Sequence, residues 1–266
     1  MAILVGVIGI LVLIGVPVTG INMLKQYRIL KRTPLIKPGR VSPGYLAVKG
    51  KTVSCVKYIT PFTRKPAVYC EAKADKMRFQ EDGKVNSRIF DTIYEEHTNH
   101  PFFVEDETGR LLVDPREGFV DIVGTYHHET FLKGGSKVKV VMPPEPVRIT
   151  LDEARIPYAL SDGPFPLRLE ESAIAEGSPV FAMGYCTNDP KAIEEALSGV
   201  EGISKWSVIY VLKNGAGNQT RDQLYVSPGD DRSTSRSLLI NGWMLIVFGL
   251  LGGLVLVAVA VIMRYG

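Results

Sequence analysis

The sequence predicts a mostly β (α+β) soluble domain, either a partly open barrel or a sandwich, flanked by two transmembrane helices. Apolar residues concentrate near both chain ends, and the charges lie in the part between them. That middle part is also rich in short β-prone runs broken by Gly and Pro. Only three cysteines occur in 266 residues, which excludes a disulfide-rich secreted scaffold. Two apolar segments are too few for a multi-spanning transporter.

The two apolar segments carry the membrane prediction. Ala2–Ile21 holds 14 hydrophobic residues in 20, and Leu238–Met263 holds 21 in 26, both without a charge. A helix that crosses a bilayer needs about 20 such residues. Trp243 lies near the start of the second segment, where aromatic side chains anchor helices at the interface. The first segment lacks the basic start and small-residue cleavage site of a signal peptide, so we expect an uncleaved anchor.

Five segments follow from this pattern. They are transmembrane helix 1 at 1–24, a basic linker at 25–44, a β-rich domain at 45–226, a tether at 227–237 and transmembrane helix 2 at 238–263. The first helix is expected to continue briefly into the linker, over Met23 to Lys31.

The charge distribution predicts the orientation. Eleven Lys and Arg lie in residues 1–70, and the first acidic residue is Glu71. The membrane-proximal basic residues are Lys25, Arg28, Lys31 and Arg32. The positive-inside rule places the domain on the cytoplasmic side of an integral, two-pass membrane protein. Such residues also attract anionic lipid, by about 1 kcal/mol each near the surface, so the bilayer is a more plausible partner than nucleic acid. An unidentified protein partner is also expected, and the oligomeric state stays open.

Within the domain, one hairpin and one helix have the clearest signals. Two apolar runs in Pro101–Pro115 flank Asp106-Glu-Thr-Gly109, which is typical of a turn with glycine in the left-handed position and resembles OB-fold strands. Asn188 or Asp189 caps a helix that begins at Pro190 and ends before Gly199. Pro143-Pro144 and Pro146 predict a stop. The other predicted strands are 45–50, 52–59, 67–74, 88–94, 119–123, 137–142, 167–169, 180–185 and 206–212.

Residues able to carry chemistry are few. His97 and His100, with Glu95 and Glu96, could form a metal cluster, but no cysteine pair completes it, so we expect solvated histidines there and at His127 and His128. The three cysteines are expected to be small buried apolar residues. The sequence therefore predicts no catalytic residue, no metal site and no cofactor. The cysteines are Cys55, Cys70 and Cys186.

Four motifs in order resemble the GIDE domain family. They are Lys49-Gly50-Lys51 with Val53, Pro61–Tyr69, Pro101–Asp114, and Glu170 with Glu176–Gly184, and two apolar helices flank them as in that family. The resemblance covers about residues 40 to 240. The positions that match the family motifs are Pro61, Pro66, Tyr69, Pro101, Phe102, Asp106, Gly109, Asp114, Glu170, Gly177 and Gly184.

The resemblance implies the domain that lies beside the membrane in mitochondrial E3 ubiquitin ligases and their prokaryotic relatives. In the ligases, a RING domain with Cys and His zinc ligands follows the second helix. Here Arg264-Tyr265-Gly266 follow it, and three cysteines cannot build the RING cross-brace. We therefore expect a prokaryotic-style member without a RING domain.

The expected function is a membrane-anchored interaction or regulatory module without a catalytic site of its own. Two alternatives remain open: a protein of the E3 ubiquitin ligase type, as the resemblance implies, and an OB-like domain that binds lipid or nucleic acid.

Overall fold

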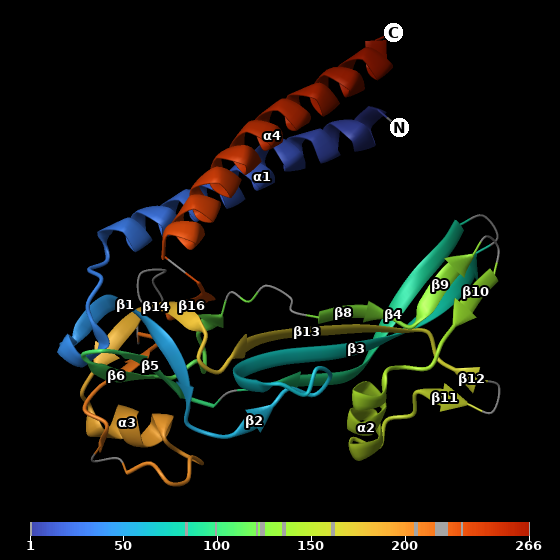
Figure 1. The fold of residues 1–266 in the computed structure, drawn as a ribbon. Helices are drawn as coiled ribbons and strands as arrows, with labels where there is room; N and C mark the ends of the chain where they lie inside the picture. The colour runs from blue at the N-terminus through green and yellow to red at the C-terminus, as the bar shows by residue number, and fades with distance from the viewer. Residues whose placement is uncertain are drawn as a thin grey trace.

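The first and last helices of the chain pack antiparallel and project from a β-rich body (Figure 1). This helix pair is called the hairpin below. The computed structural model describes residues 2–265, apart from 83–84, 99, 121, 123–125, 135–136, 161–162, 205–206, 216–222 and 230. Helices α1 (Ala2–Arg32) and α4 (Asp231–Tyr265) lie side by side, and both chain ends are at the end of the hairpin away from the body. The predicted α+β class with two apolar terminal helices is confirmed.

Five strands of the body close into a barrel. The order is β1 (Gly44–Ser54), β5 (Phe102–Asp106), β6 (Gly109–Val113), β15 (Val211–Lys213) and β14 (Pro179–Thr187), and β14 pairs with β1 to complete the ring. Strands β6 and β15 are parallel, and every other neighbouring pair is antiparallel. This connectivity is OB-like. The barrel is closed rather than partly open.

Side chains that point inward from alternate positions of each strand fill the barrel. In the hairpin β5–β6, Phe102 and Val104 point inward with Leu111 and Val113, whereas Phe103 faces outward. Successive side chains of a strand point to opposite faces, so the apolar runs of this hairpin supply both the barrel interior and an outer apolar layer. The predicted hairpin and its Gly109 turn, at φ 146°, are confirmed.

Helix α3 (Pro190–Ala196) covers that outer layer. The side chain of Asp189 accepts a hydrogen bond from the Lys191 backbone N–H at 3.0 Å, which is the predicted N-cap. Ile193 and Ala196 pack on Phe103 and on Leu112 of β6.

Segments of the chain that lie between the barrel strands form a second sheet. It has the order β2 (Tyr58–Ile59), β3 (Pro66–Asp82), β13 (Leu167–Ala175) and β8 (Tyr126–Glu129), and β4 (Val85–His97) pairs with β3. Strands β3 and β4 are longer than predicted because they pair with each other out to Asp82 and Val85.

Helix α2 (Glu145–Glu153) covers one face of the second sheet. Its Val147 and Leu151 pack against Cys70, Leu167 and Leu169. The preceding strand, β10 (Lys137–Val140), ends before these prolines, so the predicted stop is confirmed, but the sequence did not predict the helix that follows. Pro144 occupies the N-cap position and Pro146 lies in the first turn, where a missing backbone N–H costs nothing.

Short elements complete the body. Strand β16 (Tyr225–Pro228) pairs with β14, and β7 (Phe119–Val120) pairs with β16. Trp206 of the predicted strand 206–212 lies outside the described residues. The remaining elements are β9 (Phe131–Gly134), β10 (Lys137–Val140), β11 (Ala159–Leu160), β12 (Gly163–Pro164) and the 3-10 helix η1 (Pro38–Arg40).

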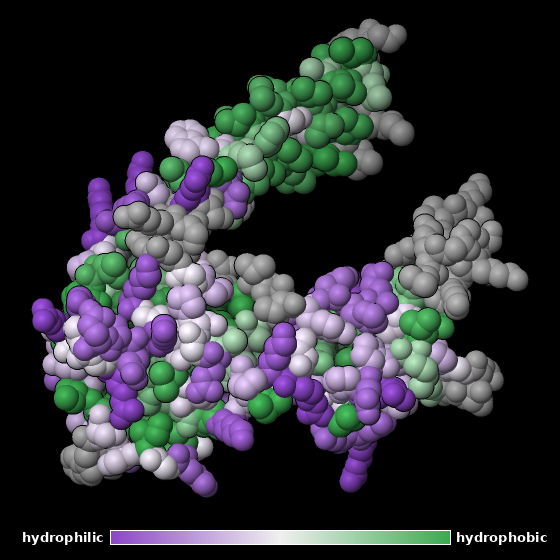
Figure 2. All heavy atoms as spheres, in the orientation of Figure 1, coloured by the Kyte–Doolittle hydropathy of each residue, from purple (hydrophilic) through white to green (hydrophobic). Residues whose placement is uncertain are grey.

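Both long helices continue past the apolar segments toward the body. Helix α1 ends at Arg32, so the helical continuation predicted at the start of the basic linker 25–44 is confirmed. Helix α4 begins at Asp231, so most of the predicted tether at 227–237 is also helical. Two candidate membrane spans lie within these helices, Val7–Arg32 and Leu239–Met263. Figure 2 shows apolar side chains over the hairpin and many polar side chains over the body.

Glycines bring the two helices into close contact. A Cβ atom at Gly249 would come within 2.6 Å of Pro17 Cδ, and one at Gly253 within 2.7 Å of Leu13 Cα. The two residues form a GxxxG pattern on the α4 face that meets α1, and small residues at this spacing let helix backbones approach. A Cβ at Gly252 would meet nothing within 4 Å.

We predict that Gly253→Leu destabilises the hairpin and that Gly252→Leu does not. The added side chain at position 253 must displace the α1 backbone, and overpacking of this kind costs about 1–3 kcal/mol. The measurement is the melting temperature of the full chain in detergent. Equal melting temperatures for the two variants would contradict this account of the helix contact.

Candidate functional site

The joint between α1 and the barrel is fixed by packing and by backbone hydrogen bonds. Leu30, in the last turns of α1, packs on Ala47 of β1 and on Phe181 and Met183 of β14, on the outer face of the barrel. Just after the helix, the Ile36 N–H donates to the Ala47 carbonyl at 2.8 Å, and the Ala47 N–H donates to the Pro34 carbonyl at 3.0 Å. The helix therefore meets the barrel through an ordered joint, although the sequence predicted a linker.

A pocket of about 440 Å³ lies at this joint. Two helices and the surface of the body that faces them contribute to it. Its lining includes Met23, Gln26 and Leu30 of α1, Asn241 of α4, and Phe119 and Tyr225 of the body. Because these residues come from separate segments of the sequence, no local motif could have revealed the pocket.

An aromatic pair forms one wall of the pocket. The rings of Phe119 and Tyr225 stack with centroids 5.9 Å apart and an interplanar angle of 18°. Phe119 is 60% exposed, although it is a large apolar side chain. On the same side, the Tyr45 hydroxyl donates to the Gln223 carbonyl at 3.3 Å. The pocket thus joins an apolar surface to several polar groups.

The predicted membrane-proximal basic residues lie beside the pocket, not in its lining. Lys25, Arg28, Lys31 and Arg32 are all exposed on the last turns of α1. Arg28 lies two positions from both Gln26 and Leu30 of the lining, which is about 200° around the helix, so it faces away from the pocket. Lys25 lies four positions before the lining residue Ile29, about 40° around the helix, so it borders the lining.

The family-motif residues are spread over the body rather than gathered at one site. Phe102 and Gly184 belong to the barrel, and Pro101 is buried just before β5. Gly109 and Gly177 adopt positive φ in turns. Glu170 lies on an exposed part of β13, with one carboxylate oxygen 3.5 Å from His127 Nδ1.

The other motif residues hold turns and strand ends together. The Pro61 carbonyl accepts a hydrogen bond from the Thr150 hydroxyl of α2 at 2.7 Å, and Pro66 begins β3. The Tyr69 hydroxyl donates to Glu71 at 2.7 Å. Asp106 accepts the Thr108 backbone N–H at 2.7 Å across the hairpin turn.

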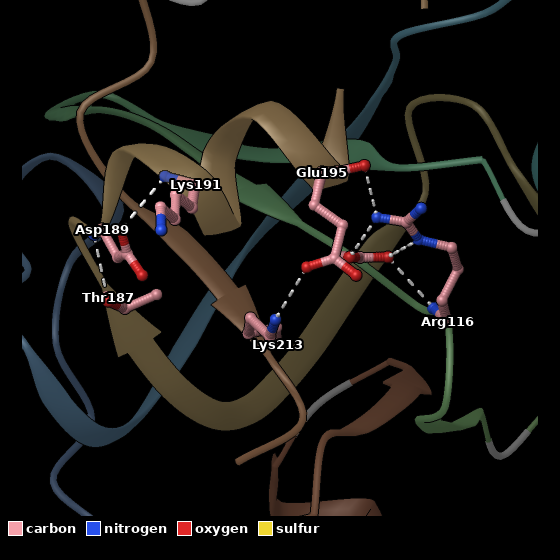
Figure 3. A network of polar contacts seen from close by, with 7 residues as sticks. Arg116, Thr187, Asp189, Lys191, Glu195 and Lys213 are labelled. Atoms are coloured by element: carbon pink, nitrogen blue, oxygen red, sulfur yellow. Dashed lines mark hydrogen bonds and ion pairs between the residues drawn. The ribbon is translucent and has the colours of Figure 1, made fainter. Parts of the chain in front are cut away.

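Asp114 belongs to a polar network that ties α3 to the barrel (Figure 3). The Arg116 guanidinium donates to both Asp114 oxygens at 2.8 Å and to the Glu195 carbonyl at 2.7 Å. Lys213 lies 3.6 Å from the Glu195 carboxylate. The Asp114 side chain is nearly buried, so its charge needs this partner. The network holds α3 over the outer face of β5 and β6.

The buried carboxylates of the second sheet also have structural partners. Glu171 is 1% exposed and accepts the backbone N–H groups of Phe62 at 2.7 Å and Thr63 at 3.2 Å, so it fixes the turn that begins at Pro61. Asp75 accepts from Arg168 at 2.6 Å and from Thr92 at 2.9 Å. Nothing in the sequence distinguishes these buried acids from surface charges, so no sequence pattern predicts their role.

The cysteine thiols are protonated at neutral pH. Cys55, Cys70 and Cys186 are all free, and burial raises the pKa of each to about 12. Cys70 and Cys186 are buried as predicted, and Cys55 is half-buried. A thiol nucleophile or zinc ligand must reach the thiolate form, which these environments disfavour.

Two histidines lie on β8, one at the end of β4 and one shortly after it. His97 packs 6.0 Å from the Tyr69 ring, and His128 stacks on Tyr126 with centroids 6.1 Å apart. His100 is exposed after β4, and His127 is exposed on β8. Within the part of the chain that the structure describes, no three His, Cys, Asp or Glu side chains are grouped to hold a metal ion.

We predict that Arg116→Met lowers stability more than Lys191→Met. Removal of Arg116 leaves the Asp114 charge nearly buried without its partner, at a cost of about 3 kcal/mol. Lys191 is the matched control, since its contact with Asp189 uses only its backbone N–H. The check is the melting temperature of the full chain in detergent, and an unchanged value for Arg116→Met would refute the structural role.

We predict that Asp75→Asn removes an acid-dependent part of the stability. Burial alone would raise the pKa of Asp75, but hydrogen bonds from Arg168, Thr92 and Lys73 lower it. A carboxyl whose pKa is lower in the folded state than in the unfolded state stabilises the fold at pH values above its unfolded pKa of about 4. This stabilisation is lost as the pH falls through the pKa of the folded state. The variant should therefore melt lower at pH 7 and lose less stability between pH 5 and 2. The control is Asp91→Asn, because the ion pair of Asp91 with Arg78 is exposed. Equal losses of melting temperature in the two variants would contradict the prediction.

Comparison with known proteins gives no match, either among protein-family models, among curated proteins or among solved structures. The resemblance to the GIDE family therefore rests on the four sequence motifs and stays a prediction. The structure itself shows an OB-like barrel joined to two apolar helices, with a pocket at the joint.

Proposed function

We propose that this chain is a membrane-anchored, GIDE-like interaction or regulatory module without a catalytic site of its own. The ordered joint between the helix hairpin and the barrel is the observation that carries the proposal. A flexible tether would only localise the body, whereas Leu30 and the hydrogen bonds to Ala47 hold it at a set position against the hairpin. That arrangement suits a domain that presents a surface beside the bilayer.

The polar groups of the body support a non-catalytic role. A catalytic acid or nucleophile needs a pKa matched to its task and access to a substrate. Here the nearly buried carboxylates Asp75, Asp114 and Glu171 are each held by hydrogen bonds within the fold. The raised pKa values of the three thiols point the same way.

The OB-like barrel favours one alternative, a nucleic-acid-binding domain. OB-folds bind oligonucleotides on the face of their second and third strands, which here are β5 and β6. Aromatic side chains on that face would stack on bases. Phe103, the outward aromatic residue of β5, is instead 3% exposed beneath α3. The covered face favours a protein or lipid partner over nucleic acid.

The basic residues support a cytoplasmic body. Lys25, Arg28, Lys31 and Arg32 are exposed at the body end of α1, and Arg236 is exposed near the start of α4. The positive-inside rule then places this end of the hairpin in the cytoplasm.

The proposed anchoring and orientation can be tested together by cysteine labelling. Ile209→Cys places a thiol on the body at a position that is 70% exposed, whereas the native thiols have raised pKa values and give a low background. We expect the chain to stay in membranes after alkaline extraction. A membrane-impermeant maleimide should label the variant in opened cells and leave it unlabelled in intact cells.

The wild-type chain is the control for background labelling. Extraction into the soluble fraction would refute the membrane anchor, and labelling in intact cells would refute the cytoplasmic orientation.

A further inference from the structure

The pocket at the joint lies beside the body-side ends of both candidate membrane spans. Met23, Gln26 and Leu30 belong to the end of the span Val7–Arg32, and Asn241 lies near the start of the span Leu239–Met263. If both helices cross a bilayer, these residues lie at the level where acyl chains meet headgroups. The pocket is then reached from the membrane interface.

The lining combines apolar surface with neutral hydrogen-bonding groups. Leu30, Met183 and Leu224 supply apolar surface, whereas Gln26, Gln223 and Asn241 carry amides. Amide groups donate to neutral oxygen acceptors such as esters and ethers. Among the described residues of the lining, the charged side chain is the acidic Glu117, which disfavours a phosphate inside the pocket. This chemistry fits an apolar chain attached to a neutral oxygen linkage.

The exposed aromatic ring at the wall supports the same ligand. Phe119 is 60% exposed while stacked on Tyr225, so a large apolar surface is presented at the pocket. Contact with a lipid chain would remove that surface from water, and aromatic rings are favoured at membrane interfaces. The volume of about 440 Å³ also lies within the range of about 300–1,000 Å³ that is usual for small-molecule sites.

We propose that this pocket binds one membrane lipid, and that it takes the upper part of a lipid chain with its neutral ester or ether linkage. The headgroup stays outside the pocket. The lipid enters laterally from the bilayer and fills the space between α1 and the barrel. This proposal rests on the proposed membrane anchoring.

Photo-crosslinking of the full chain in vesicles tests the proposal. The vesicles contain phosphatidylcholine with a small fraction of phosphatidylcholine that carries a diazirine high on one acyl chain. We expect cross-links in peptides that contain Phe119 or Tyr225, in addition to those on the outward surface of the helices. Replacing the vesicle lipid with phosphatidylglycerol should leave the yield at Phe119 and Tyr225 within twofold, because the described residues that line the pocket include no cation.

Two variants remove the site from opposite sides. Phe119→Ser removes the exposed wall, and Gln26→Trp fills the pocket from α1; each should reduce cross-linking at Tyr225 at least fivefold. Cross-links to the exposed Val255 of α4 should not change, and Ile209→Ser, at an exposed position of the body that does not line the pocket, is the matched control. A melting temperature equal to that of the wild type shows that a variant is folded.

The outcomes separate this proposal from the membrane anchoring. Chains that do not float with the vesicles would refute the anchoring. Chains that float but cross-link only on the outward surface of α1 and α4, or whose Tyr225 yield survives in both folded variants, would refute the lipid site alone.

Discussion

The backbone pairing between β1 and β14 is the interaction on which the rest of the molecule depends. It runs from Gly44 opposite Cys186 to Lys51 opposite Pro179 and turns an open sheet into a barrel. Closure satisfies backbone groups that an edge strand would expose. It also creates the outer face of Ala47, Phe181 and Met183 on which α1 rests. Without this ladder there would be neither an enclosed core nor a surface to position the helices.

The charged groups of the body act mainly as supports for this framework. Arg116 joins Asp114 to α3, Arg168 satisfies Asp75 between strands, and Glu171 holds the turn at Phe62. Since a buried charge is costly unless it is paired, each of these groups has little freedom to act on a substrate. The more adaptable surfaces are those that carry amides and exposed apolar side chains, such as the pocket at the joint.

The sequence predicted the features that depend on local pattern. The hairpin around Gly109, the cap at Asp189 and the two apolar helices follow from residue order alone, and all three are present. The sequence does not predict helix α2, because Pro144 and Pro146 indicate the end of a strand, although prolines are also tolerated in a first helical turn. The pocket depends on the closed barrel and on the seating of α1, which are long-range contacts that no local pattern encodes.

The positions that match the family motifs likewise coincide with features of the fold and not with the pocket. Phe102, Gly109 and Gly184 are explained by the inside of the barrel and by a turn, so their spacing reflects folding requirements. A Cβ at Gly184 would come within 2.9 Å of Leu224 Cδ1, which leaves no room for a larger residue without a shift. Phe119 and Tyr225, which shape the pocket, belong to none of the four motifs.

Helices α1 and α4 both connect to parts of the chain that are hydrogen-bonded to β14 or to the strands beside it. The chain leaves α1 and pairs with β1 through Leu35, and it reaches α4 directly from β16, while β1 and β16 are both hydrogen-bonded to β14. The Gly229 N–H, just before α4, also donates to the Pro179 carbonyl at the start of β14 at 2.8 Å. Both helices are therefore attached to β14 and to the two strands that pair with it, so a displacement of either helix relative to the barrel must strain this three-stranded unit first.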